Sequence, residues 1–116
     1  LLKDCKCIVH QVFGGVLQSD VTCTACNAIS LTRDPILDIS LEIKASTFGR
    51  KKKLPGDEIS LLDCLEEFTL PEKLGVGSYK CKSCGSANVE AFKQLSINTL
   101  PPVLAVQLKV CNLLEY

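Results

Sequence analysis

The alternation of apolar and polar positions predicts two extended segments in the first half of the chain. Residues 11–24 are rich in Val and contain a Gly-Gly pair, which is typical of a β-strand with a bend or bulge. A second extended run covers residues 28–44, and from Leu37 onward apolar side chains alternate with polar ones, as in a strand with one buried face. Pro35 lacks a backbone N–H, so we expect it at the start of this strand or on a sheet edge.

The period changes to that of an α-helix over residues 61–68. Ser60 and Asp63 resemble a capping box at its start, and Pro71 follows its end. We expect an amphipathic helix with an apolar face in the core and an acidic face in solvent. The residues predicted to be buried are Leu61, Leu62, Leu65 and Phe68, with Cys64 on the same face, and those predicted to be exposed are Glu66, Glu67 and Glu72.

Two further strands are predicted after the helix, over residues 88–97 and 103–108, with a Pro-Pro pair between them. The order of strands, one short helix and more strands indicates an α+β fold that is mostly antiparallel β. At 116 residues the chain has the length of one domain.

Composition narrows the class of protein. Hydrophobic residues make up 47% of the chain, which is high for its size, so we expect part of the apolar surface to contact something else. The net charge of +0 gives no general argument for nucleic acid or an anionic membrane, and the basic run at 49–56 is interpreted as a solvated loop.

No apolar stretch reaches the roughly 18 residues of a membrane span. The N-terminus has neither an initiator Met nor the apolar core of a signal peptide, so it reads as a cut within a longer chain.

Four of the eight cysteines form two C-x-x-C pairs, Cys23/Cys26 and Cys81/Cys84, and Gly85 directly follows the second pair, where a tight turn favours glycine. An even cysteine count fits a disulfide framework in a secreted protein, and a single C-x-x-C fits a redox motif beside a βαβ unit. Neither context is present, whereas two such pairs complete the tetrahedral shell of one metal ion. We therefore predict a zinc ribbon, with iron as the other metal that thiolates accept. A shell closed by four cysteines makes the metal structural.

The remaining cysteines give weaker signals. Cys5, Cys7 and His10 could supply three ligands of an incomplete second zinc site, although composition alone favours two buried thiols and an ordinary histidine. Cys64 lies on the apolar face of the predicted helix and is most simply a core residue.

Five motifs, taken in order, resemble the middle of a ubiquitin-specific protease catalytic domain, a papain-like cysteine protease fold. They are FGGVLQSDVTCTAC, DPILDISLEI, SLLDCLEEFTLPEKL, YKCKSCGS and AFKQLSINTLPPVLAVQLK. The resemblance assigns residues 1–109 to the zinc-bearing fingers and part of the palm. CKCIVH and DPILDISLEI most resemble the deubiquitinase subunit of the SAGA transcriptional coactivator complex, fungal type. In that subfamily the C-x-C-x-x-H element resembles part of a second zinc site with a fourth ligand further upstream, so the resemblance implies that Cys5, Cys7 and His10 are zinc ligands.

The resemblance implies a thiol-dependent deubiquitinase that acts on a ubiquitinated protein such as a histone. Its implied partners are ubiquitin and the other subunits of a SAGA deubiquitinating module, and its implied location is the nucleus. The family's nucleophile box lies N-terminal to this segment, and its His box lies C-terminal. We therefore expect no catalytic residue in this chain, no activity of the chain alone, and a role in gripping ubiquitin.

The family pattern fails from Val110 onward, so residues 110–116 are interpreted as an anomalous tail, with a truncated or misspliced reading frame as the hypothesis for its origin. Two other functions stay open on the residues alone. A free-standing zinc-ribbon module would bind a protein or nucleic acid, but basic and aromatic residues are not interleaved near the cysteine pairs. A redox protein would show reversible thiol oxidation instead of tight metal binding.

Overall fold

A computed structural model of the chain describes residues 5–43 and 58–110. Both the basic run at 49–56 and residues 111–116 lie outside the described residues. The elements are α1 (Ile8–Phe13), β1 (Gly15–Cys23), β2 (Ile29–Ile36), β3 (Ile39–Ile43), α2 (Leu61–Thr69), β4 (Glu72–Leu74), β5 (Ala91–Thr99) and β6 (Val106–Val110). The predicted α+β class and the mostly antiparallel β-structure are confirmed.

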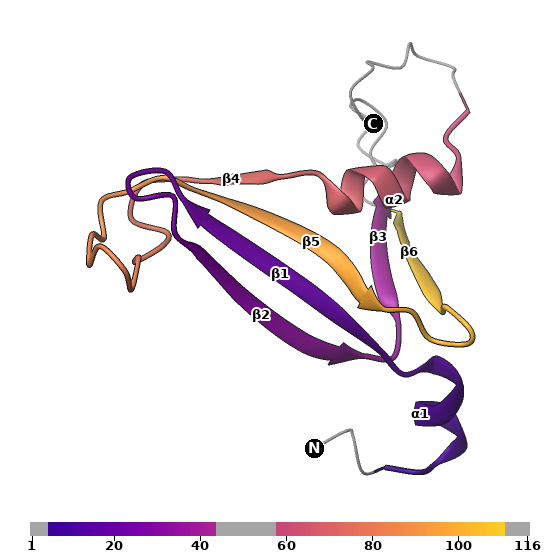
Figure 1. Cartoon of the computed structure of the whole chain (residues 1–116). Helices are drawn as coiled ribbons and strands as arrows, with labels where there is room; N and C mark the ends of the chain where they lie inside the picture. The colour runs from indigo at the N-terminus through magenta and orange to yellow at the C-terminus, as the bar shows by residue number, and fades with distance from the viewer. Residues whose placement is uncertain (1–4, 44–57, 111–116) are drawn as a thin grey trace.

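The strands form two sheets (Figure 1). A long antiparallel sheet has the order β2-β1-β5-β4, and a small second sheet pairs β3 with β6 in parallel. The long sheet extends away from the small sheet and α2, so that its far end stands apart from the rest of the fold (Figure 1). Parallel pairing of β3 and β6 was not predicted, because it joins segments from the two halves of the chain.

The first predicted strand is partly wrong. Residues 8–13 are helical, and β1 begins only at Gly15. The backbone N–H of Gly14 donates to the carbonyl of His10 and closes this short helix. The bend expected at the Gly-Gly pair appears just after it, as a register shift between Val16 and Leu17 where β1 pairs with β5.

The second predicted strand divides into β2 and β3 at residues 37–38. Pro35 lies in β2, the edge strand of the long sheet, which confirms the expected edge position. Alternation holds in β3, where Ile39 and Leu41 are buried, whereas Leu37 precedes the strand and is exposed. The predicted strands at 88–97 and 103–108 correspond to β5 and β6 with ends shifted by two or three residues.

The predicted helix is confirmed as α2, and its capping box is present. The backbone N–H of Asp63 donates to Ser60 Oγ at 3.2 Å, and the backbone N–H of Ser60 donates to Asp63 Oδ2 at 2.7 Å. Cys64 is buried, as expected, and forms a core with Ile39 and Leu41 of β3. Leu65 and Phe68 are half-buried against this core.

Three burial predictions for α2 are wrong. The side chains of Leu61 and Leu62 are 53% and 64% exposed, and Glu67 is half-buried instead of exposed. A nine-residue helix packs only one side on β3, through positions 64, 65 and 68, and the two leucines of the first turn lie outside that contact. Glu66 and Glu72 are exposed, as predicted.

Candidate metal centre

The four cysteines of the two C-x-x-C pairs come together at the far end of the long sheet. Their Sγ atoms all lie within 4.8 Å of one another. Cys23 is the last residue of β1 and Cys26 lies in the turn between β1 and β2, whereas Cys81 and Cys84 lie in the connection between β4 and β5 (Figure 1). We call the two turns knuckle 1 (residues 23–28) and knuckle 2 (residues 81–86).

Strand register explains why the two knuckles meet. β1 ends at Cys23, directly opposite Ala91, where the antiparallel strand β5 begins. The turn that leaves β1 and the connection that enters β5 therefore emerge at the same end of the sheet. The backbone N–H of Thr24 extends this pairing by donating to the carbonyl of Glu90 at 3.2 Å.

The knuckles repeat one backbone geometry. In each, the first cysteine's carbonyl accepts a hydrogen bond of 2.9 Å from the residue after the second cysteine, Asn27 or Gly85. Both of these residues are left-handed, with φ of 58° and 71°, and Gly85 was predicted to allow such a tight turn. The sequence interpretation missed Asn27, although Asn is the residue after Gly that best tolerates this conformation. Its place after a C-x-x-C pair was the available signal.

Each knuckle contains one buried and one exposed thiol. Cys23 and Cys81 are 0% and 1% exposed, whereas Cys26 and Cys84 are exposed. Each contact between the knuckles joins an exposed sulfur to a buried one. Cys26 Sγ lies 3.6 Å from Cys81 Sγ, and Cys84 Sγ lies 4.0 Å from Cys23 Sγ.

The pKa values of two thiols in this cluster are shifted in opposite directions. A hydrogen bond from the backbone N–H of Cys84, helped by Ser83, lowers the pKa of Cys81 to about 6. A backbone hydrogen bond from Ala28 favours the Cys26 thiolate, but desolvation and the neighbouring sulfurs outweigh it and raise the pKa of Cys26 to about 11. Four sulfurs this close do not all ionise without a cation, and a divalent ion supplies the missing positive charge.

Few apolar side chains support the knuckles. Val89 is the buried residue that accompanies Cys23 and Cys81, with Ala28 and Tyr79 packed beside them. Desolvation raises the pKa of Tyr79, which keeps its phenol neutral. Such a small cluster offers little hydrophobic stabilisation. A metal crosslink at this end would supply what the core lacks.

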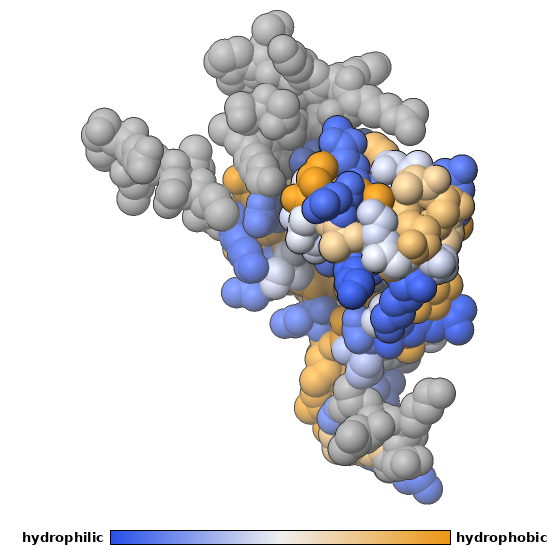
Figure 2. All heavy atoms as spheres, turned by 90° about the vertical axis from the view of Figure 1, so that its left-hand side faces the viewer, coloured by the Kyte–Doolittle hydropathy of each residue, from blue (hydrophilic) through white to orange (hydrophobic). Residues whose placement is uncertain are grey.

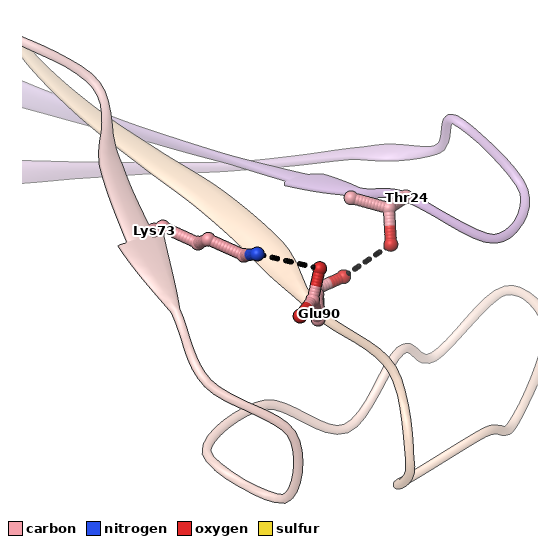
Figure 3. A network of polar contacts seen from close by, with 3 residues as sticks. All are labelled: Thr24, Lys73 and Glu90. Carbon is pink, nitrogen blue, oxygen red and sulfur yellow. Dashed lines mark hydrogen bonds and ion pairs between the residues drawn. The ribbon is translucent and has the colours of Figure 1, made fainter.

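A polar network also ties knuckle 1 to the neighbouring strands of the sheet (Figure 3). Thr24 Oγ1 donates to the backbone carbonyl of Glu90 at 2.8 Å, and Lys73 Nζ of β4 lies 3.0 Å from Glu90 Oε2. The lysine and glutamate side chains are 57% and 43% exposed, so this ion pair contributes little stability, about 0–1 kcal/mol. The ion pair joins β4 to Glu90, the residue that directly precedes β5.

A second cluster lies at the start of α1. Ligand atoms of Cys5, Cys7 and His10 fall within 4.8 Å of one another, and Cys7 Sγ is 2.8 Å from His10 Nδ1. This hydrogen bond is the largest cause that lowers the pKa of Cys7 to about 6. Both cysteines are exposed, so the interpretation of them as buried thiols was wrong.

Comparison with known proteins identifies the family. The family model described as "Ubiquitin carboxyl-terminal hydrolase" matches residues 2–113. The chain belongs to the ubiquitin carboxyl-terminal hydrolase family. It is 45% identical over 108 residues to ubiquitin carboxyl-terminal hydrolase nonstop of Drosophila melanogaster, a match that covers 90% of this chain and 20% of that protein. It is also 44% identical over 118 residues to human ubiquitin carboxyl-terminal hydrolase 27, covering 90% of this chain and 27% of the relative.

Solved structures place the chain near the SAGA type within this family. The structure of the SAGA Ubp8/Sgf11/Sus1/Sgf73 DUB module bound to ubiquitin aldehyde matches with a TM-score of 0.70 and 41% identity. The match covers 92% of this chain and 21% of the solved one. The chain thus spans about a fifth to a quarter of the length of the family members it matches.

Proposed function

We propose that this chain is the fingers segment of a thiol-dependent deubiquitinase, and that zinc held by Cys23, Cys26, Cys81 and Cys84 stabilises it for gripping ubiquitin. One observation carries the proposal: in a chain of this family, four cysteine sulfurs converge where the long sheet has almost no core. The proposal assigns residues 1–109 to the fingers and part of the palm.

The donor set favours zinc. All four ligand atoms are sulfur, which suits zinc or iron and excludes magnesium and calcium as preferred ions. Four cysteines in a C-x-x-C arrangement form the closed shell of a structural zinc site. Bound there, zinc would supply a crosslink between knuckles 1 and 2, and the chain's own residues would perform the rest. The backbone donors at Ser83 and Cys84 hold Cys81 ionised, and the strand pairing of β1 with β5 keeps the knuckles together.

The cluster of Cys5, Cys7 and His10 is proposed as part of a second zinc site. Three donors within 4.8 Å form most of a tetrahedral shell, and both cysteines are accessible. A fourth ligand would come from elsewhere in the longer protein. The Cys7–His10 pair also has the two groups that a cysteine protease uses for nucleophilic attack, so the activity measurement below includes variants of both residues.

For the whole protein, we propose hydrolysis of the bond after ubiquitin's C-terminal glycine, with the nucleophile and its general base outside this chain. The SAGA module bound to ubiquitin aldehyde supports ubiquitin as a partner, and the Ubp8, Sgf11, Sus1 and Sgf73 assembly supports a SAGA-type complex. A nuclear location and a ubiquitinated chromatin protein such as a histone as substrate follow from this proposal. Across residues 5–43 and 58–110, no helix has both the length and the apolar character to cross a membrane.

The proposal is tested by titrating the zinc-loaded chain into isotope-labelled ubiquitin and following ubiquitin's amide signals by NMR. We expect weak, saturable shifts, because the fingers supply only part of the interface while the cost of association remains. The shifts should disappear for Cys81→Ser and persist for Ser83→Ala, a matched change in knuckle 2. Unchanged ubiquitin spectra at millimolar concentrations of the zinc-loaded chain would reject ubiquitin gripping.

The same preparation is then incubated with ubiquitin that carries a C-terminal fluorogenic group. No turnover is expected, because this chain is proposed to hold neither nucleophile nor general base. Turnover that is abolished both by Cys7→Ser and by His10→Ala would move the catalytic centre into the N-terminal cluster and overturn the assignment.

A further inference from the structure

The four sulfurs of the metal centre differ in their access to solvent. The knuckles form the end of the molecule that faces the viewer in Figure 2, where hydrophilic and hydrophobic residues are interspersed. At this end Cys26 and Cys84 are exposed, whereas Cys23 and Cys81 are at most 1% exposed. A dissolved oxidant therefore reaches the second cysteine of each knuckle and is kept from the first.

Each exposed sulfur contacts the buried sulfur of the other knuckle. The Cys26–Cys81 and Cys84–Cys23 sulfur distances are 3.6 and 4.0 Å. A sulfur oxidised at either exposed position thus has a thiol from the opposite knuckle beside it. This is the arrangement of an oxidisable cysteine with a resolving cysteine.

We propose that the metal centre is a hydroperoxide-sensitive modification site, in which oxidation replaces the metal crosslink with two disulfides between the knuckles, Cys26–Cys81 and Cys23–Cys84. The inference rests on the proposed zinc site. It concerns how these four residues release zinc when a hydroperoxide oxidises them.

The chemistry balances with one hydroperoxide for each disulfide. With zinc bound, Cys26 is a thiolate. Its sulfur attacks the O–O bond of the hydroperoxide and becomes a sulfenic acid, while the second peroxide oxygen leaves as hydroxide and is protonated to water. The Cys81 sulfur then attacks the Cys26 sulfur, forms the S–S bond and expels hydroxide, which is also protonated. Two electrons pass from the two thiolates to the peroxide. A second peroxide does the same at Cys84 and Cys23, after which no thiolate remains to hold the metal.

The connectivity has a structural consequence. Disulfides within the knuckles, Cys23–Cys26 and Cys81–Cys84, would leave this end of the sheet without a crosslink. Disulfides between the knuckles keep β1 and β5 joined at the position where Cys23 lies opposite Ala91. The oxidised chain would then retain its strand pairing, and thiol reduction with added zinc would restore the original centre.

The experiment uses the zinc-loaded chain and a variant in which Cys5, Cys7 and Cys111 are replaced by Ser. Hydrogen peroxide is added in steps, released zinc is measured with a chromogenic chelator, and free thiols are blocked before digestion. Trypsin cuts after Lys80 and Lys82, so Cys81 and Cys84 fall on separate peptides, while Cys23 and Cys26 share one. The mass of the unreduced peptides separates disulfides within the knuckles from disulfides between them. Fragmentation of the linked peptides between Cys23 and Cys26 then shows which of the two is bonded to Cys81, which distinguishes all three ways of pairing four cysteines.

We expect about two equivalents of peroxide per zinc released, with Cys26 linked to Cys81 and Cys23 linked to Cys84. Cys64, which is 4% exposed in the core, should stay reduced and serves as the internal control. Disulfides confined within each knuckle, or zinc retained while Cys26 and Cys84 become sulfinic acids, would overturn the inference.

Zinc content is measured before any oxidant is added, which separates the two proposals. A chain that holds no zinc contradicts the proposed function. A zinc-loaded chain that gives another connectivity contradicts only the oxidation site.

Discussion

The Sγ atoms of Cys26 and Cys81 lie 3.6 Å apart, although 55 positions separate the two residues in the sequence. Pairing of β1 with β5 brings the two turns to one end of the sheet, and the sulfurs then face one another. Since few apolar side chains accompany them, the stability of this end should depend on the metal.

Changing Cys81 to Ser should therefore remove zinc and unfold the knuckles together. Structural zinc binding contributes on the order of 10 kcal/mol in small zinc peptides, and a three-ligand site forfeits much of it. Elemental analysis gives the zinc content, and amide NMR signals of residues 23–28 and 81–86 report order. Ser83→Ala, an exposed change in the same knuckle, should alter neither. Ordered knuckle signals in metal-free Cys81→Ser would contradict the prediction.

Cys7 should react as a thiolate at unusually low pH in the metal-free chain. Because the hydrogen bond with His10 lowers the pKa of Cys7 to about 6, its thiolate is the major form above that pH. The rate of iodoacetamide labelling at Cys7, followed by peptide mass spectrometry, should show a midpoint near pH 6. His10→Ala should shift the midpoint toward pH 9, while Val9→Ala on the same helix leaves it unchanged. A midpoint that does not move in His10→Ala would show that the hydrogen bond is not its cause.

Leu65→Ala should destabilise the fold by about 2 kcal/mol, the lower end of the range for leucine, because Leu65 is half-buried. Leu62→Ala supplies the control three positions earlier in α2. Its side chain is 64% exposed, so its free energy of unfolding should change by no more than about 0.5 kcal/mol. Urea denaturation of the zinc-loaded chains measures both. Equal effects for the two leucines would place them in one apolar contact, against the packing described above.

Ser60→Ala should cost about 1 kcal/mol, because it removes the side-chain acceptor for the Asp63 backbone N–H and breaks the capping box. Ser60→Asn keeps an acceptor of similar capping strength and should stay within a few tenths of a kcal/mol of the parent. Helical circular dichroism during urea denaturation compares the three chains. An alanine variant as stable as the parent would show that the cap carries no stability here.

Local signals in the sequence identified the elements whose cause is local. Ser60 and Asp63 marked the helix start because the capping box acts over three residues, and Gly85 marked the tight turn because its φ is positive. The spacing within each C-x-x-C pair similarly pointed to the metal centre before any contact between Cys26 and Cys81 was known.

Features that depend on contacts between distant parts of the chain could not be predicted from the sequence. Nothing near Ile39 indicates that its parallel partner is Val106. The Val-rich start of the chain favoured a strand, whereas Gly14 closes a short helix there. The periodicity around Leu61 and Leu62 identified apolar positions, but it carried no information on which of them another element would cover.

The order of strands in the long sheet determines the order in which its strand pairs can form while the chain is being synthesised. A growing chain can form the β1–β2 hairpin, which carries the first pair of thiols, as soon as residue 36 has emerged from the ribosome. The other edge of β1 then stays open until β5 arrives, and the small sheet waits longer still, because β3 pairs with the end of the described chain. Such late, distant pairings are the slow steps of folding. Early in synthesis, then, the nascent polypeptide has two of the four metal ligands and an unpaired edge on β1. Synthesis of knuckle 2 and β5 supplies the other two ligands and the strand that pairs with this edge.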